Sequence, residues 1–317
     1  MTFFSFFDQI PCLILRQGII KPRSGEKMDL EHIVRDVIHL ANGRLSQPFE
    51  ITQKRGYGGQ MDDVVTEIDK AAQETYIRML FKYFPEFGVV AEEQELMVPC
   101  QMGGTDVYVT VDPIDGTKAL VRRQSHGIGT MIALVHDGKI IAAYVGDVKT
   151  GEIYGYESAM NSDVVRIYSL TNREILSIDT LRPLSEQAVI LNDDPRNYPP
   201  FVQAFAHKTD CGGLFKKVRT TEGSLGIGIA RLWKGEIGAA LISIHPAPPW
   251  DITPVIGISQ KMGFVFLRVN METKQFEPYE PPISKKIEWG PKYVLMIHQS
   301  RLPELRTWEA RFHNSRL

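Results

Sequence analysis

Four acidic clusters in this sequence could supply oxygen ligands to a metal ion. Each of them follows an apolar run or opens a helical one: Thr66-Glu67-Ile68-Asp69, Ala91-Glu92-Glu93, Asp112-Pro113-Ile114-Asp115 and Trp250-Asp251. Hard cations such as Mg²⁺ prefer carboxylate oxygens, usually together with water and substrate phosphate. The clusters therefore predict a divalent-cation site, provided that the fold brings them together.

The segment from Asp112 to Thr117 has the most informative spacing. Asp112 and Asp115 lie three residues apart across a proline that fixes the turn, so both carboxylates can face one cavity. Gly116-Thr117 then leads into an expected helix at 118–123, whose first N–H groups would attract phosphate. Metal ligands beside a phosphate cradle are typical of a phosphoryl-transfer site.

Each cluster taken alone also has a structural explanation. Asp-Pro and Asp-Gly are ordinary turn dipeptides, and adjacent glutamates such as Glu92-Glu93 often form a solvated pair. Asp251 could be a helix N-cap. Thr66 and Asp69 have the spacing of a capping box, which would explain both without catalysis. Only the combination of clusters indicates chemistry.

The first half of the chain must position three of the clusters. Apolar residues at helical spacing predict helices at 28–43 and 66–84, separated by a polar, glycine-rich stretch from Gln53 to Asp63 that predicts a mobile loop. Asp137-Gly138 predicts a hairpin turn. Strands are expected at 88–91, 107–111, 129–135, 139–145 and 152–156.

The second half alternates between the two kinds of element. Strands are expected at 189–191, 216–218, 237–244 and 293–297, and helices at 199–207, 223–233, 251–262 and from 303 onward. Such alternation implies a sheet covered by helices. We therefore predict an α/β (α+β layered) fold of two packed subdomains, residues 28–185 and 186–317.

Composition and charge narrow the class of protein. With 43% hydrophobic and 23% charged residues in 317, the chain is typical of a globular protein with a sizeable core. A formal net charge of -2 without a basic block does not favour binding to a nucleic-acid polymer. The three cysteines are widely spaced and form no CxxC pair, which argues against a disulfide framework or a zinc site and fits a reducing, cytoplasmic location.

Residues 1–27 differ from the rest. Their apolar run is interrupted by Asp8, lacks a preceding basic residue and is shorter than the roughly 20 residues that span a bilayer. Met28 starts the first amphipathic helix. We expect residues 1–27 to be an extension of a body that begins near Met28, with a membrane-surface helix as the alternative, and no membrane partner for the body.

In this order and at these separations, the segments VTEID, AEE, VDPIDGT and PPWDITP resemble the inositol monophosphatase superfamily of lithium-sensitive, magnesium-dependent phosphatases. The resemblance runs from Met28 to the last expected strand. It implies an αβαβα sandwich, two or three Mg²⁺ per site, and hydrolysis of a phosphate monoester by in-line attack of an activated water.

The resemblance also assigns roles to individual residues. Thr117, partnered by Asp69, would orient the attacking water, and Gly116 and Thr117 would offer N–H groups to the phosphate. Lys54 is the suggested counterpart of a loop lysine that helps to hold a water, although the loop length differs. The implied metal ligands are Glu92, which also belongs to the catalytic set, Asp112, the carbonyl of Ile114, Asp115 and Asp251.

The residues expected to contact the substrate do not match any single branch of the superfamily. In inositol-specific members a glutamate lies seven residues before the Trp-Asp aspartate, and here that position is Ile244. Lys118 resembles both the bisphosphate-nucleotidase branch and histidinol-phosphatase-like members. Arg122 and Arg123 could meet a second phosphate, and an exposed helix face is the alternative for all three basic residues.

Three further residues are candidates for contacts with the substrate. Gly223 and Ser224 open an expected helix and could contact hydroxyl groups, although a helix cap explains Ser224 equally well. His245 is a candidate in the proline-rich loop before Trp250, where a plain loop histidine is the alternative.

We therefore expect a magnesium-dependent phosphatase whose partner is a small phosphorylated polyol or sugar. The alternatives are a 3′(2′),5′-bisphosphate nucleotidase, a histidinol-phosphate phosphatase, or, from a different class, a non-catalytic protein that binds a phosphorylated ligand. Relatives of this kind commonly form homodimers, so a homodimer is a further expectation.

Overall fold

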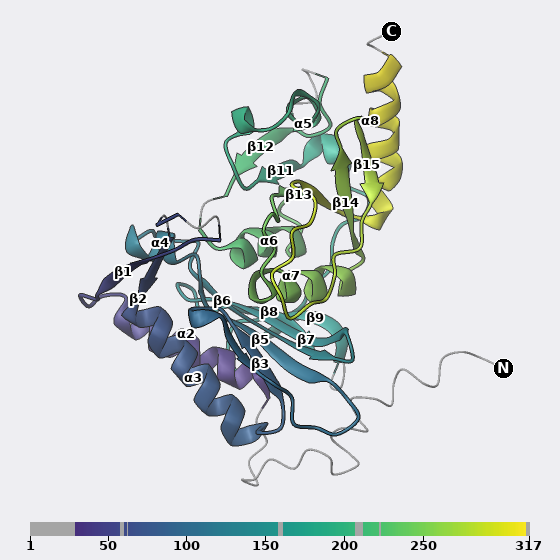
Figure 1. Cartoon of the computed structure of the whole chain (residues 1–317). Coiled ribbons are helices and arrows are strands. Elements are labelled where there is room, and N and C mark those ends of the chain that lie inside the picture. The colour runs from purple at the N-terminus through teal and green to yellow at the C-terminus, as the bar shows by residue number, and fades with distance from the viewer. Residues whose placement is uncertain are drawn as a thin grey trace, which may run out of the picture.

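The computed structural model describes residues 29–57, 60–61, 63–157, 161–206, 212–221 and 223–314. The expected N-terminal extension, Met28 and the end of the helix expected to reach His207 lie outside these residues. Helices and sheets alternate in layers (Figure 1). No described helix has the length and apolar character needed to cross a membrane.

In the described residues, the first sheet has eight strands in the spatial order β10-β9-β8-β7-β6-β5-β3-β4. β3 and β5 are parallel, and the neighbours from β5 to β10 are antiparallel. Asp137 and Gly138 form the β6–β7 turn with positive φ angles of 47° and 74°, as the dipeptide predicts. The strands are β3 (Gly88–Ala91), β4 (Leu96–Val98), β5 (Val107–Asp115), β6 (Gly129–His136), β7 (Lys139–Asp147), β8 (Ile153–Glu157), β9 (Asn161–Ile167) and β10 (Arg173–Ile175).

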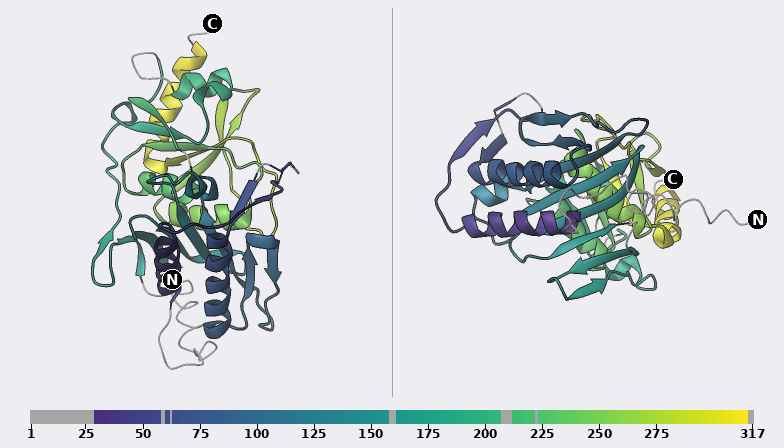
Figure 2. Two further views of the ribbon diagram at one scale, coloured as in Figure 1. Left: turned by 90° about the vertical axis from the view of Figure 1, so that its left-hand side faces the viewer. Right: turned by 90° about the horizontal axis from the view of Figure 1, so that it is seen from below.

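Two helices cover one face of this sheet. α2 (Leu30–Arg44) is capped by Asp29, which accepts the N–H of His32 at 3.0 Å. α3 (Glu67–Tyr83) lies beside α2 across the strands, as Figure 2 shows from below. Both turn an apolar stripe toward the sheet, because their buried residues recur at helical spacing.

The opposite face packs against α6 (Leu225–Trp233) and α7 (Pro249–Lys261), which separate it from a second sheet. In the described residues that sheet has six strands in the order β12-β11-β13-β16-β14-β15, covered outside by α5 (Pro200–Ala206) and α8 (Leu302–Asn314). The predicted αβαβα sandwich is confirmed. The strands are β11 (Ala188–Leu191), β12 (Lys217–Thr220), β13 (Ala239–Ile242), β14 (Phe264–Asn270), β15 (Gln275–Pro278) and β16 (Val294–His298).

Two local predictions are wrong, and several strands, among them the hairpin β14–β15, were not expected. Gln53 and Lys54 lie in β1 (Ile51–Lys54), which pairs with β2 (Asp63–Thr66), so both ends of the expected loop are strands. The hairpin β14–β15 was not expected, because its turn contains no Gly, Pro or Asn-Gly signal. α7 begins at Pro249, ahead of the expected start at Asp251, since a proline suits the first helical position. The subdomain boundary near residue 185 stays a prediction.

Candidate active site

A lysine from β1 and two glutamates after β3 meet in a cleft of about 490 Å³. The Nζ atom of Lys54 lies 2.9 Å from Oε1 of Glu92 and 3.0 Å from Oε1 of Glu93. Glu92 follows β3 directly, and its N–H donates to the carbonyl of Val111 on β5 at 3.1 Å. This bond places the Glu92-Glu93 cluster beside the cluster of Asp112 and Asp115. Lys54, suggested only as an approximate counterpart, thus contacts an expected metal ligand.

β5 brings Asp112 and Asp115 into the site through an irregularity in its pairing with β6. Pairing stops after Asp112 and resumes at Asp115, which leaves Pro113 and Ile114 outside the ladder. A proline is tolerated at such a bulge because it has no N–H to pair. Asp112 is 2% exposed, and its Oδ1 has no hydrogen-bond partner among the described residues. An unpartnered buried carboxylate oxygen is costly, so this position suits a cation.

Asp115 is held by the start of α6. The hydroxyl of Ser224 donates to its Oδ2 at 2.5 Å, and the N–H groups of Leu225 and Gly226 donate to its carboxylate at 3.0 Å and 2.8 Å. Helix N-termini favour negative charge in this way. Ser224 also caps α6 by accepting the N–H of Ile227 at 2.9 Å. The cap interpretation of Ser224 is therefore confirmed, and the same residue ties α6 to the first sheet.

Thr117 and Asp69 are hydrogen-bonded, as the resemblance implied. The Thr117 hydroxyl lies 2.8 Å from Oδ1 of Asp69 and 3.1 Å from the carbonyl oxygen of Ile114. The other carboxylate oxygen of Asp69 accepts the N–H and the hydroxyl of Thr66, which completes the capping box of α3. The two explanations of Asp69 are compatible, because each uses a different oxygen.

Asp251 enters the site from the first turn of α7. Pro248 occupies the N-cap position, so the interpretation of Asp251 as a cap is wrong. The neighbouring Trp250 is 3% exposed, and its ring lies 6.5 Å from that of Tyr57, which follows β1. The charges of Glu92 and Asp115 act on Asp251, so a side chain from the helix between the two sheets lies near the carboxylates of the first sheet.

Burial and like charge raise the pKa values of these carboxyl groups. For Asp112 and Asp251, burial is the largest cause, the charge of Glu92 adds to it, and both pKa values lie well above the usual range. Burial and then Glu92 raise the pKa of Glu93 to about 7, although Lys54 opposes the shift. Burial alone would lower the pKa of Lys54, but the two glutamates outweigh it and the pKa is raised. A divalent cation would relieve this repulsion.

The donor atoms fit such a cation in type. In the described part of the chain, no group of three His, Cys, Asp or Glu side chains is arranged to hold a metal ion as it stands. Lys54 is hydrogen-bonded to Glu92, and the start of α6 is hydrogen-bonded to Asp115. Asp112 keeps an unpartnered oxygen. Carboxylate and carbonyl oxygens without sulfur or imidazole suit Mg²⁺ rather than a softer metal. The set thus fits a hard cation, which would compete with Lys54 for Glu92.

A sequence model described as "Inositol monophosphatase family" matches residues 27–296. The chain belongs to the inositol monophosphatase family. It is 24% identical over 217 residues to a histidinol-phosphatase from Chlorobaculum parvum. The aligned residues cover 64% of this chain and 71% of that protein. It is 32% identical to the Nus factor SuhB of Escherichia coli K12 over 95 residues, 29% of this chain and 33% of that protein.

The fold agrees with the family. A solved structure of an IMPase/NADP phosphatase complexed with Mg²⁺ and phosphate superimposes with a TM-score of 0.59 at 19% identity, covering 95% of this chain and 94% of the other. At that identity the likeness establishes the fold only. The stretch matched to SuhB is about a third of that protein's length, so the activity of the whole relative does not transfer to this chain directly.

Within this family fold, two predicted substrate contacts are sites of close backbone approach. Gly116 and Gly223 have φ angles of 91° and 86°, and a Cβ on either would lie 2.4 Å from the carbonyl oxygen of Gly127. Only glycine fits both positions. The N–H of Ser224 donates to the same oxygen at 2.9 Å. The glycines thus join the start of α4 (Thr117–Val121) to the start of α6.

The remaining predicted contacts lie on the surface. Lys118 is half exposed and forms a long ion pair of 3.8 Å with the first residue of β2. Arg122 and Arg123 are exposed. His245 is exposed, and its Nδ1 lies 2.8 Å from the carbonyl oxygen of Gly290. Their roles in substrate binding stay predictions.

Two residues of the cleft were not predicted to be part of the site. Glu93 is 6% exposed and shares Lys54 with Glu92. Tyr57 lines the cleft, and burial followed by the charges of Asp251 and Glu92 raises its pKa. The double glutamate after an apolar strand was a signal for Glu93, but no sequence pattern indicated that Tyr57 would reach the site.

Proposed function

We propose that this member of the inositol monophosphatase family hydrolyses a phosphate monoester on a small polyol or sugar, and that it requires Mg²⁺. The observation that carries the proposal is the buried, unpartnered Oδ1 of Asp112 among carboxyl groups from β3, β5 and α7. A protein that did not bind a cation there would bear the cost of that burial without compensation.

One group of residues would bind the cation. Glu92, Asp112, Asp115, Asp251 and the carbonyl of Ile114 would hold the cation. Bound there, Mg²⁺ would supply charge neutralisation for the phosphate and acidification of a water molecule.

Thr117 and Asp69 would orient the attacking water. The Thr117 hydroxyl can accept a hydrogen bond from a water while it donates to Asp69, which fixes the direction of its lone pairs. Held in this way, a water can attack the phosphorus atom in line with the leaving oxygen. The first N–H groups of α4, from Gly116 onward, would bind phosphate oxygens, and Lys54 would balance the charge of the glutamates.

Substrate choice is tested by comparing substrates directly. Phosphate release should be measured with inositol phosphate, fructose bisphosphate, histidinol phosphate and a 3′,5′-bisphosphate nucleotide, each with Mg²⁺ and with a chelator. Turnover of polyol or sugar phosphates that depends on Mg²⁺ supports the proposal. A nucleotide or histidinol phosphate turned over far faster than the others would overturn the substrate class but keep the reaction. Histidinol phosphate is included because one relative of this chain is a histidinol-phosphatase.

A non-catalytic role is the competing proposal, and the relative named as a Nus factor makes it worth testing. Asp112→Asn provides the control, because it removes one carboxylate charge at nearly constant volume. If the wild type and this variant release phosphate equally slowly from every compound, and the wild type still binds phosphorylated ligands, the protein is a binding protein.

A further inference from the structure

The segment that connects β15 to β16 crosses from the second sheet to the first. This strap, residues 279–290, leaves the second sheet at Tyr279, whose N–H donates to the carbonyl of Phe266 at 2.9 Å. Further along, Lys285 forms an ion pair of 2.5 Å with Asp106, next to the start of β5, and its Nζ lies 4.6 Å from the ring centroid of Tyr108. The strap therefore contacts the strand that carries Asp112 and Asp115.

The strap also fixes the loop before α7. Ala247 and Glu288 exchange two backbone hydrogen bonds of 2.8 Å and 3.1 Å, which form an isolated antiparallel bridge. At its end, the carbonyl of Gly290 accepts from His245. Pairing at two points holds the segment that leads into the helix, and Asp251 follows within its first turn.

Side-chain packing connects the strap to the site. Ile283 and Ile287 pack against the cluster formed by Val90, Tyr108, Val135 and Trp250. Trp250 belongs to α7 and precedes Asp251, whereas Val90 and Tyr108 belong to the strands next to Glu92 and Asp112. The strap thus covers the point where the helix meets the first sheet.

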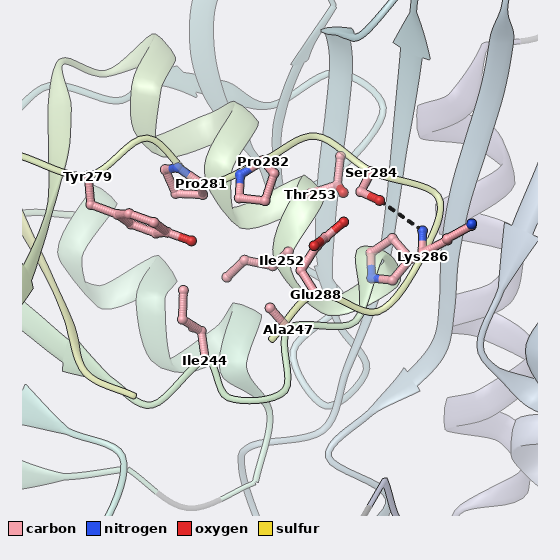
Figure 3. A pocket seen from close by; sticks show the side chains of 11 residues that line it. Ile244, Ala247, Ile252, Thr253, Tyr279, Pro281, Pro282, Ser284, Lys286 and Glu288 are labelled. Atoms are coloured by element: carbon pink, nitrogen blue, oxygen red, sulfur yellow. Dashed lines mark hydrogen bonds between the residues drawn. The ribbon is translucent and has the colours of Figure 1, made fainter. Parts of the chain in front are cut away.

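The strap leaves little room beneath it. Figure 3 shows side chains of the strap, including Tyr279, Pro281 and Ser284, arranged over Ile252 and Thr253 of α7. The hollow that they enclose has a volume of about 10 Å³, about enough for one water molecule. This region is a packed contact rather than a ligand pocket.

We propose that the strap is a positioning element of the active site. Lys285 anchors it to Asp106 and Tyr108 beside the start of β5, and Ile287 packs against the cluster that contains Trp250, so that Asp251 stays close to the strand that carries Asp112. This inference rests on the proposed function, because its measurable consequence is the affinity for a divalent cation. Residues that orient metal ligands typically contribute about 10- to 100-fold to affinity.

The test compares strap variants by calorimetric titration with Mn²⁺ and by phosphatase assays over a range of Mg²⁺ concentrations. We expect Ile287→Ala to weaken Mn²⁺ binding about tenfold and to raise the half-saturating Mg²⁺ concentration by a similar factor. Turnover at saturating Mg²⁺ should stay within about twofold of wild type, since the catalytic groups remain. Lys286→Ala is the matched control, because this strap residue is exposed and lies outside the cluster around Trp250.

A charge exchange provides a second test that does not create a cavity. Lys285→Glu and Asp106→Lys should each weaken Mn²⁺ binding about threefold, a modest effect because the pair is partly exposed. The double variant should restore the wild-type affinity. Restoration would show that the contact between strap and sheet, not either residue alone, sets the affinity.

Three results would overturn the inference. Mn²⁺ affinity unchanged in Ile287→Ala would show that the strap does not position the ligands. A loss of turnover and folded fraction together, with an unchanged Mg²⁺ requirement, would show a merely structural role. If the wild type bound no divalent cation, the proposed function would fail and the inference with it, whereas failure of the strap variants alone leaves the proposed function intact.

Discussion

In the absence of a divalent cation, the protein should become less stable as the pH rises from 5 to 8. The folded state raises the pKa of Glu93 from 4.5 to about 7, so between these values the folded protein binds more protons than the unfolded chain. The free energy of unfolding therefore falls as pH rises. A shift of about 2.5 pH units corresponds to roughly 3 kcal/mol, and Glu92, Asp112 and Asp251, whose pKa values are also raised, contribute with the same sign.

Urea unfolding at pH 5 and pH 8, with a chelator present, measures this difference. Glu93→Gln should flatten the profile by about 3 kcal/mol, because its amide does not titrate. His298 has a lowered pKa, from burial and then Arg301, and works in the opposite direction, but it is common to both proteins and cancels in their difference. With saturating Mg²⁺ the wild-type profile should flatten as well. If the free energy of unfolding without the cation is constant or rises toward pH 8, the folded state does not raise the pKa values of these carboxyl groups and the reasoning is refuted.

Three substitutions give further tests. Asp112→Asn should lower kcat/KM about a thousandfold and yet stabilise the cation-free protein by about 1–3 kcal/mol, as phosphate release and urea unfolding would show; a stability loss would contradict the unpaired-charge argument. Thr117→Val should lower kcat about a hundredfold with little change in KM in steady-state assays, and normal turnover would exclude Thr117 from water orientation. Ser224→Ala removes the α6 cap and a donor to Asp115, so calorimetry should show about 1–3 kcal/mol of destabilisation, and an unchanged melting temperature would mean that water replaces both bonds.

Much of the fold follows from local sequence patterns. α2 and α3 begin where Asp29 and Thr66 supply caps, and the apolar spacing that follows defines their buried faces. The hairpin at Asp137-Gly138 follows from the turn preference of two residues. β14 and β15 were missed because their turn, at Lys274 with a φ of 53°, uses a non-glycine residue in the left-handed region, and no sequence rule of turns indicates it.

The site was predictable in composition but not in contacts. The acidic clusters indicated which side chains could bind a cation, since oxygen ligands at strand ends and helix starts form a recognisable set. Their partners were not predictable, because Lys54 and Glu92 are 38 residues apart and Ser224 and Asp115 are 109 apart. Such pairs depend on how the layers stack, which local spacing does not encode. Tyr57 is the extreme case, since its place in the cleft depends on the position of β1 and on its contact with Trp250.

The proposed ligands are divided among layers, so cation binding should be coupled to the folding of the whole chain. Glu92 and Asp112 come from the first sheet, and Asp251 comes from a helix that also packs on the second sheet. Neither part holds the set alone, so a cation can bind tightly only when both are packed together. Because binding to the folded state alone stabilises it, the cation should offset the carboxylate repulsion that acts between α7 and the first sheet. The strap acts on the same contact, and we therefore expect its variants to lose stability mainly in the absence of the cation.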